Sequence, residues 1–232
     1  MIKYILWLLF PSRCACCNVL IEKDKHLCED CSSKIERIKR LCTVCGSDKR
    51  GCVCKYRTYH FKGAAAPFNH GDVSKQTINN FKFRGNIEVA EFLSEEMVKS
   101  VREAFGSVKF DAVLSVPMQR LKKILVGFNQ SEVLARKIAN ALGVPYKNNL
   151  KKLKRNKTQH EMSFKDRMLN VKGVYGCEEI EAENVLLVDD IKTTGATLDE
   201  CARQIMFAGA RNVYGVTAVS NFYKKQQLKK SK

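Results

Sequence analysis

The hydrophobic positions of this chain fall into two alternating patterns from about residue 63 onward. Continuous apolar runs bounded by turn residues predict buried strands of a parallel sheet; these runs cover residues 64–68, 110–116, 185–188 and 212–219. Apolar positions at helical spacing predict helices, two of them ended by Gly143 and Gly209; they cover residues 73–83, 87–105, 130–142 and 197–207. Strands that alternate with helices predict an α/β domain with a mostly parallel sheet flanked by helices.

The N-terminal region does not follow this pattern. Residues 13–54 hold nine of the eleven cysteines and many charges, but few long apolar runs. Such a segment cannot build a hydrophobic core of its own and needs metal ions or disulfides. The composition therefore predicts a Cys-rich domain (1–62), an α/β domain (63–222) and a basic C-terminal tail (223–232). Within the α/β domain, the highly charged residues 151–170 are expected to form a mobile surface excursion.

The cysteine spacing predicts structural zinc sites. Pairs separated by two residues let both thiolates reach one tetrahedral Zn²⁺. The eight candidate ligands are Cys14, Cys17, Cys28 and Cys31 for a first ion, and Cys42, Cys45, Cys52 and Cys54 for a second. Cys16 is an alternative to Cys14, and the second set is the weaker prediction because its last pair is one residue short. Four thiolates close a zinc site, so a structural and not a catalytic role is expected.

Charge and cysteine usage bear on partners and location. A net charge of +17 favours an anionic partner such as nucleic acid, a phosphorylated metabolite or a membrane surface. No convincing export signal precedes the cysteines, because the apolar residues 5–10 are too short to span a bilayer and no small-residue cleavage site follows them. We therefore expect a cytoplasmic protein with reduced thiols. The apolar start is expected to pack on its own domain, with peripheral contact with the inner membrane as the alternative.

The segment 185–197 (VLLVDDIKTTGAT) combines several features that suit a phosphorylated sugar. A buried strand delivers two adjacent carboxylates, Asp189 and Asp190, to the carboxyl edge of the sheet, where ligands of α/β proteins bind. Two carboxylates can accept hydrogen bonds from a vicinal diol such as ribose. Gly195 permits close approach of the backbone, and the N–H groups at the start of the following helix bind phosphate. Thr197 as a simple helix cap is the alternative for the loop alone.

This segment resembles the binding signature for 5-phosphoribosyl-1-pyrophosphate (PRPP) of type I phosphoribosyltransferases. The resemblance implies that Asp189 and Asp190 hold the ribose 2′- and 3′-hydroxyls. It also implies that Thr193, Thr194, Gly195, Ala196 and Thr197 cradle the 5′-phosphate, with Lys192 as a further PRPP-binding residue. Magnesium would bridge the ribose and pyrophosphate oxygens, since this ion prefers ligand phosphates to a full protein cage.

Further motifs resemble those of the ComF/ComFC competence proteins. These are FKFRG at 81–85, VPMQR at 116–120, GFNQ at 127–130, and Thr158-Gln159 with Arg167 and Asn170-Val171, which resembles their mobile loop. Arg120 and Lys122 are candidates on the pyrophosphate side, and Arg167 is a candidate from the mobile loop. The chain departs from the family pattern at Val126 and Gln119, and has Lys122 and Lys123 where arginines are more common, which puts the affinity for pyrophosphate in doubt because lysine lacks the bidentate fork of arginine.

The resemblance implies a phosphoribosyltransferase whose acceptor is unknown and whose role is linked to the handling of incoming DNA. The alternative is a non-catalytic adaptor of the transformation machinery that senses PRPP or a nucleotide and binds single-stranded DNA. Lysine-rich stretches at 147–157 and 224–232 would then contact phosphates. Competence-machinery proteins are the expected protein partners in both cases.

Overall fold

A five-stranded parallel sheet forms the centre of the molecule. The computed structural model describes residues 11–52, 54, 58–84, 87–119, 123–125, 127–154 and 171–221. The sheet has the order β3-β9-β8-β5, with β4 also paired to β9, and all of these pairings are parallel. The strands are β3 (Gly63–Ala65), β4 (Phe68–Asn69), β5 (Ala112–Ser115), β8 (Ala182–Lys192) and β9 (Ala210–Ser220).

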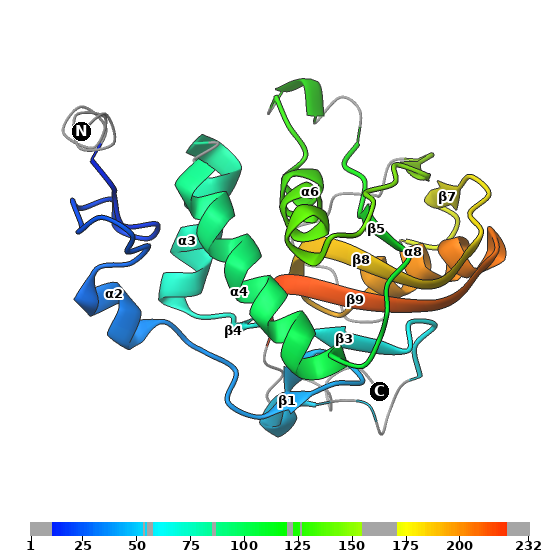
Figure 1. Cartoon of the computed structure of the whole chain (residues 1–232), viewed down its shortest axis with the longest axis horizontal. Coiled ribbons are helices and arrows are strands. Elements are labelled where there is room, and N and C mark those ends of the chain that lie inside the picture. Colours follow the sequence, from blue (N-terminus) through cyan, green and yellow to red (C-terminus); the bar gives the residue numbers. More distant parts are fainter. Residues whose placement is uncertain are drawn as a thin grey trace.

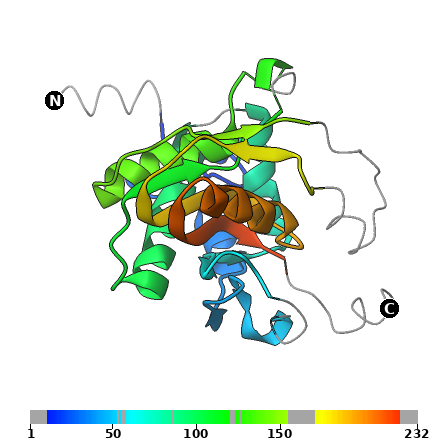
Figure 2. The ribbon, with the colours of Figure 1, turned by 90° about the vertical axis from the view of Figure 1, so that its right-hand side faces the viewer.

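Helices cover both faces of this sheet (Figures 1 and 2). Leu186 and Val188 of β8 belong to the core shared with α3 (Asp72–Arg84), α4 (Ile87–Phe105) and α6 (Gln130–Leu142). Val185 and Leu187 point to the opposite face and pack with α8 (Ala196–Phe207). A hairpin of β6 (Leu150–Lys152) and β7 (Tyr175–Cys177) lies beside α8. This architecture, behind a Cys-rich N-terminal region, confirms the predicted fold class.

Most predicted elements are found where the pattern placed them. The helices over 87–105 and 130–142 have the expected bounds, and Gly143 ends α6 with a left-handed φ of 67°. The strand predicted at 185–188 is longer and continues to residue 192, because β8 keeps pairing with β9 as far as Lys192↔Ser220. Residues 151 and 152 were predicted to belong to a mobile excursion, and this is wrong, since they pair with β7 in an antiparallel hairpin. Residues 155–170 of that segment lie outside the described residues, as do 1–10 and 222–232.

The Cys-rich region packs directly against the α/β domain. It contains α2 (Glu29–Lys34), the short hairpin β1 (Leu41–Cys42) and β2 (Ser47–Asp48), and the 3₁₀ turn η1 (Lys49–Gly51). Leu27 and Ile35 share a hydrophobic core with Phe68 and Phe92 of the larger domain. Figure 1 shows α2 near α3 and α4, and β1 next to β3. The boundary at residue 62 stays a prediction, and across it the two parts are joined by buried contacts.

Among the described residues, no helix combines the length and the apolar character needed to cross a membrane.

Truncation of a buried side chain in the central strand β8 should destabilise the whole protein. Leu186 is fully buried between the sheet and α4 and α6, so we expect Leu186→Ala to lower the free energy of unfolding by about 2–5 kcal/mol. Leu125 is 86% exposed and serves as the matched control; Leu125→Ala should change stability by less than about 0.5 kcal/mol. Denaturant unfolding of the two variants measures the difference, and equal losses would contradict the assignment of the core.

Candidate functional site: a carboxylate pair, a glycine loop and two cysteine clusters

The two adjacent carboxylates lie at the end of β8. Successive side chains of a strand point to opposite faces of the sheet. Asp190 therefore lies on the face covered by α3, α4 and α6. The Asp189 side chain leaves the strand on the face of α8. The Asp190 carboxylate forms an ion pair with Lys82 of α3 at 2.7 Å. The Asp189 carboxylate accepts hydrogen bonds of 2.9 Å from the Ser131 hydroxyl of α6 and from the backbone N–H of Asp190. The pair is thus held by α3 and α6, which lie on the same side of the sheet.

These surroundings change the acidity of Asp189. Burial disfavours its charged form, and the negative charge of Asp190 adds to this effect, so that the pKa of Asp189 is raised to about 7. The hydrogen bond from Ser131 and the positive charge of Lys82 act in the opposite direction. A carboxylate that is poised between its two forms near neutral pH, next to an ionised neighbour, is typical of a ligand-binding or catalytic site.

A three-residue loop follows β8 and leads directly into α8. Gly195 has a φ of 76°, a left-handed conformation that favours glycine, and α8 begins at the next residue. Thr194 is buried, and its hydroxyl accepts a hydrogen bond of 3.2 Å from the N–H of Ala196. The first turn of the twelve-residue helix α8 therefore starts beside the carboxylate pair. The N–H groups and the dipole at such a helix start favour an anion.

Lys192 links the end of β8 to the Cys-rich region. It is the last residue of β8, its side chain is only 5% exposed, and its ammonium group donates to the Ser47 hydroxyl at 3.0 Å. Ser47 belongs to the Cys-rich region. The structure therefore joins this lysine to β2, and its part in PRPP binding remains a prediction.

The segment after β5 reaches the same edge of the sheet. The Val116 N–H donates to the carbonyl of Val188 at 2.9 Å, and the Asn129 side chain donates to the carbonyl of Val116 at 3.2 Å. This places the start of α6, with Ser131, next to Asp189. The candidate catalytic residues Arg120 and Lys122 from this segment, and Arg167, lie outside the described residues, so their roles remain predictions.

Three residues of this site were not predicted as site residues: Lys82, Ser131 and Ser47. Lys82 lies in the FKFRG stretch, and Ser131 follows GFNQ directly, so both are next to motifs that the sequence analysis singled out. Ser47 carried no signal, because only the folded chain brings it to Lys192.

The cysteine clusters have the geometry of two zinc sites. The ligand atoms of Cys14, Cys17, Cys28 and Cys31 lie within 4.8 Å of one another, and so do those of Cys42, Cys45, Cys52 and Cys54. Individual Sγ–Sγ distances are 3.6 Å for Cys17 and Cys28 and 3.7 Å for Cys42 and Cys54. Four sulfurs at ~2.3 Å from one tetrahedral ion are about 3.8 Å apart, so both sets fit Zn²⁺.

The clusters bear on two points that the cysteine spacing left open: the choice between Cys14 and Cys16, and the short last pair of the second set. Cys14 and not Cys16 completes the first group. The Cys16 thiol is buried, which raises its pKa. The short spacing of the second set does not prevent Cys54 from joining its group. For Cys42, burial disfavours the thiolate, but hydrogen bonds from the Cys45 backbone and from Cys52 outweigh this and lower its pKa to about 7, which suits a metal-bound thiolate.

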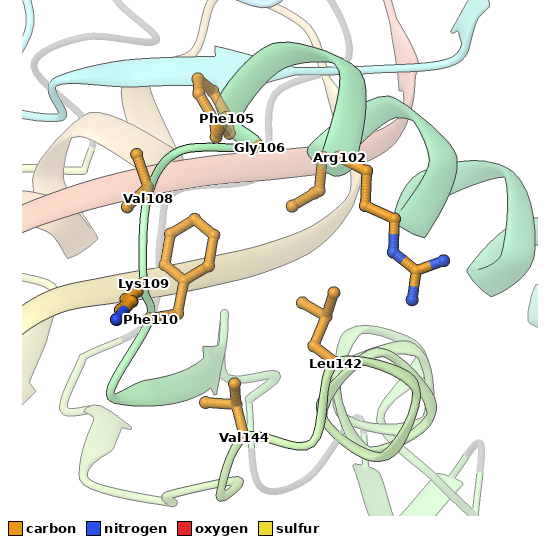
Figure 3. Close-up of a pocket in the computed structure, with 9 residues that line it drawn as sticks. Arg102, Phe105, Gly106, Val108, Lys109, Phe110, Leu142 and Val144 are labelled. Carbon is orange, nitrogen blue, oxygen red and sulfur yellow. The ribbon is translucent and has the colours of Figure 1, made fainter.

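A cavity of about 280 Å³ lies away from this site, at the opposite end of the strands (Figure 3). Its lining includes Phe105 near the end of α4, Leu142 and Val144 at the end of α6, and Phe110 just before β5. Because ligands of parallel sheets bind at the carboxyl ends of the strands, this cavity is not the candidate site.

Comparison with known proteins finds a family model for the Cys-rich region and curated relatives over about three fifths of the chain. Residues 5–59 match the model of the double zinc ribbon domain. Competence protein F of Haemophilus influenzae is 29% identical over 59% of this chain and 63% of its own length. Competence protein ComFC of Bacillus subtilis is 28% identical over 61% of this chain and 57% of its own. DNA utilization protein YhgH of Escherichia coli K12 is 29% identical over 59% and 62%, respectively.

These relatives confirm the resemblance to the ComF/ComFC proteins. The chain spans about three fifths of the length of the curated relatives that it matches. Their names concern competence and DNA utilization. The chain is thus similar to ComF-type proteins over about three fifths of its length and to the double zinc ribbon domain at residues 5–59.

Solved structures similar to this chain include a phosphoribosyltransferase and an amidotransferase. Adenine phosphoribosyltransferase from Saccharomyces cerevisiae is 19% identical, with a TM-score of 0.39 over 60% of this chain and 72% of that chain. Glutamine PRPP amidotransferase from B. subtilis is 18% identical, with a TM-score of 0.37 over 60% and 36%. At these scores the likeness adds nothing about ligands or activity.

The cluster geometry predicts two zinc ions per chain. Cys31→Ser and Cys54→Ser should each reduce the zinc content from two ions to one, because each removes one of four thiolates from a different cluster. Cys16→Ala is the matched control from the same segment and should keep both ions. Elemental analysis of the purified variants measures the stoichiometry, and loss of zinc from the Cys16 variant alone would reverse the assignment.

The raised pKa of Asp189 predicts a pH-dependent penalty on stability. The folded protein holds this proton up to about pH 7, whereas the ordinary value is 3.8, so the unliganded protein loses stability as the pH rises toward 7. We expect Asp189→Asn to raise the melting temperature at pH 8 by about 2–4 °C, equivalent to ~1 kcal/mol, and by less at pH 6. Thermal unfolding of both proteins at the two pH values tests this; a gain that does not grow with pH would contradict it.

Proposed function

We propose that this protein binds PRPP together with Mg²⁺ and transfers its phosphoribosyl group to an acceptor, as part of DNA uptake or handling. The observation that carries the proposal is the placement of Asp189 and Asp190 at the end of a buried strand, directly beside a loop with a left-handed glycine and the start of α8. A sugar diol and a phosphate on one small molecule satisfy both halves of this arrangement. The ComF-type relatives support the biological setting.

The residues of the site suggest how each part of PRPP is held. The carboxylates of Asp189 and Asp190 accept hydrogen bonds from the ribose 2′- and 3′-hydroxyls. Ser131 and Lys82 already orient these carboxylates in the structure. The N–H groups from Thr194 to Thr197 then receive the 5′-phosphate, with the threonine hydroxyls as further donors. Magnesium, when bound with PRPP, would screen the charge of the pyrophosphate.

The proposed reaction breaks the bond between C1 of the ribose and the pyrophosphate oxygen and forms a bond from C1 to the acceptor. The chain contributes positioning and the stabilisation of charge on the leaving group. Arg120, Lys122 and Arg167 are the proposed cations for the latter role. The residues described above do not form a pocket for a particular base, so the site does not specify the acceptor.

A second function follows from the charge of the chain. A net charge of +17 and relatives named for DNA utilization also suit an adaptor that binds PRPP or a nucleotide without catalysis and contacts single-stranded DNA. Release of pyrophosphate in the presence of a tested acceptor would separate the transferase from the adaptor, because only the former turns PRPP over.

Binding of PRPP should depend on the carboxylate pair. We expect the double variant Asp189→Asn, Asp190→Asn to bind PRPP and Mg²⁺ about 100-fold more weakly or worse, since it loses charged acceptors for two hydroxyls. Asp111→Asn is the matched control: this carboxylate accepts from the N–H groups of Glu183 and Asn184 at the opposite end of the strands. Isothermal titration calorimetry measures all three affinities. Wild-type protein without detectable affinity for PRPP would refute the proposal.

A further inference from the structure

The second cysteine cluster is joined to the phosphate loop through buried polar contacts. Lys192 precedes the loop and donates to the Ser47 hydroxyl at 3.0 Å, and Ser47 lies 3.2 Å from the Ser220 hydroxyl. Ser47 is only 2% exposed and Ser220 is fully buried. The N–H of Asn221 donates to the Lys192 carbonyl at 2.8 Å. Both the side chain and the backbone of Lys192 are therefore held from outside the loop.

The turn that carries Cys42, Cys45 and Ser47, here called the zinc knuckle, lies directly against the central sheet. Ser47 follows Cys45 by two residues, and Gly46 between them has a φ of 68°. A Cβ atom at Gly46 would lie 3.0 Å from the Cβ of Ala64 in β3. The Ala64 N–H donates to the carbonyl of Thr43 in the same knuckle at 2.8 Å. Because the cluster and the sheet share this contact, the position of Ser47 depends on the fold around the second metal site.

The segment after the second cluster contacts the other end of the loop. The backbone N–H of His60 donates to the Asp199 carboxylate in the first turn of α8 at 2.6 Å. A Cβ atom at Gly195 would lie 3.5 Å from the ring of Tyr59. The loop of Thr193, Thr194 and Gly195 is thus flanked by residues of the Cys-rich region at its start and at its end.

From these contacts we infer that the second zinc ribbon is a structural part of the phosphate-binding site. Ser47 holds Lys192, and Lys192 is a positioning residue that fixes the start of the phosphate loop; it does not itself contact the phosphate. The inference rests on the proposed function in that it takes the loop as the binding site for PRPP. It goes beyond it by making the affinity for a phosphorylated sugar depend on a metal cluster of otherwise structural character.

The buried ammonium group explains why a single hydroxyl matters. A charged group in the interior requires hydrogen-bond partners, and the removal of one partner costs more than the net value of an ordinary hydrogen bond. Ser47→Ala removes one acceptor from Lys192, so the ammonium group is expected to shift toward other acceptors or solvent. The backbone at residues 192–195 would move with it. Ser47→Thr retains a hydroxyl and should keep the wild-type arrangement.

The test measures the loop itself as well as ligand binding. Hydrogen–deuterium exchange at residues 193–199, calorimetry with PRPP and Mg²⁺, and zinc content are compared for wild type, Ser47→Ala and Cys54→Ser. Ser47→Ala should keep two zinc ions, exchange faster at 193–199 and bind PRPP about 10-fold more weakly. Cys54→Ser should show the same changes with one zinc ion fewer. Adding Ser47→Ala to Cys54→Ser should cause little further loss, because both act through one contact.

Two controls separate this effect from general destabilisation. Ser94→Ala removes another buried hydroxyl, which donates to the Glu91 carbonyl within α4, and should leave exchange at 193–199 and PRPP affinity unchanged. Ser47→Thr should restore both. The inference is overturned if Ser47→Ala exchanges at 193–199 like wild type or matches Ser94→Ala. If the wild-type protein binds no PRPP, the proposed function fails, while the exchange data still decide whether the ribbon holds the loop.

Discussion

The parallel pairing of β8 with β9 is the constraint on which the rest of the structure depends. The register runs from Ala182↔Ala210 to Lys192↔Ser220 without leaving the sheet. Its central part is apolar on both sides, so it buries two separate cores, one against α3, α4 and α6 and one against α8. Its last part carries the polar side chains of Asp189, Asp190 and Lys192. Stability and chemistry therefore come from different halves of the same strand pair.

A pair of adjacent, partly buried carboxylates is a costly arrangement, and the structure reduces this cost in two ways. Lys82 forms an ion pair with Asp190, and Ser131 donates to Asp189. The remaining penalty appears in the raised pKa of Asp189. A ligand with adjacent hydroxyl groups, or a divalent cation bound with it, would stabilise the ionised pair. The unliganded site is thus less stable than an apolar strand end would be, which is the usual relation between a binding site and its scaffold.

The cysteine clusters serve the packing of a region that has few apolar residues of its own. Each cluster gathers four thiolates around one point. The segment around the first cluster packs against α3 and α4, and the segment around the second cluster packs against β3. Asn80 of α3, for example, donates to the carbonyls of Ala15 and Cys16. The Cys-rich region is therefore packed on the α/β domain through the segments around both clusters.

The sequence by itself determined the α/β class, the bounds of α4 and α6, the two groups of four cysteines and the location of the carboxylate pair, because each of these depends on local pattern: apolar periodicity, a glycine at a helix end, paired cysteines, or a polar run after an apolar strand. Only the tertiary structure decided that β8 continues to Lys192, that residues 150–152 form a strand, and that Ser47, Lys82 and Ser131 meet the site. These features depend on contacts between residues 23 to 145 positions apart in the chain, and such contacts leave no mark on the local pattern of either partner.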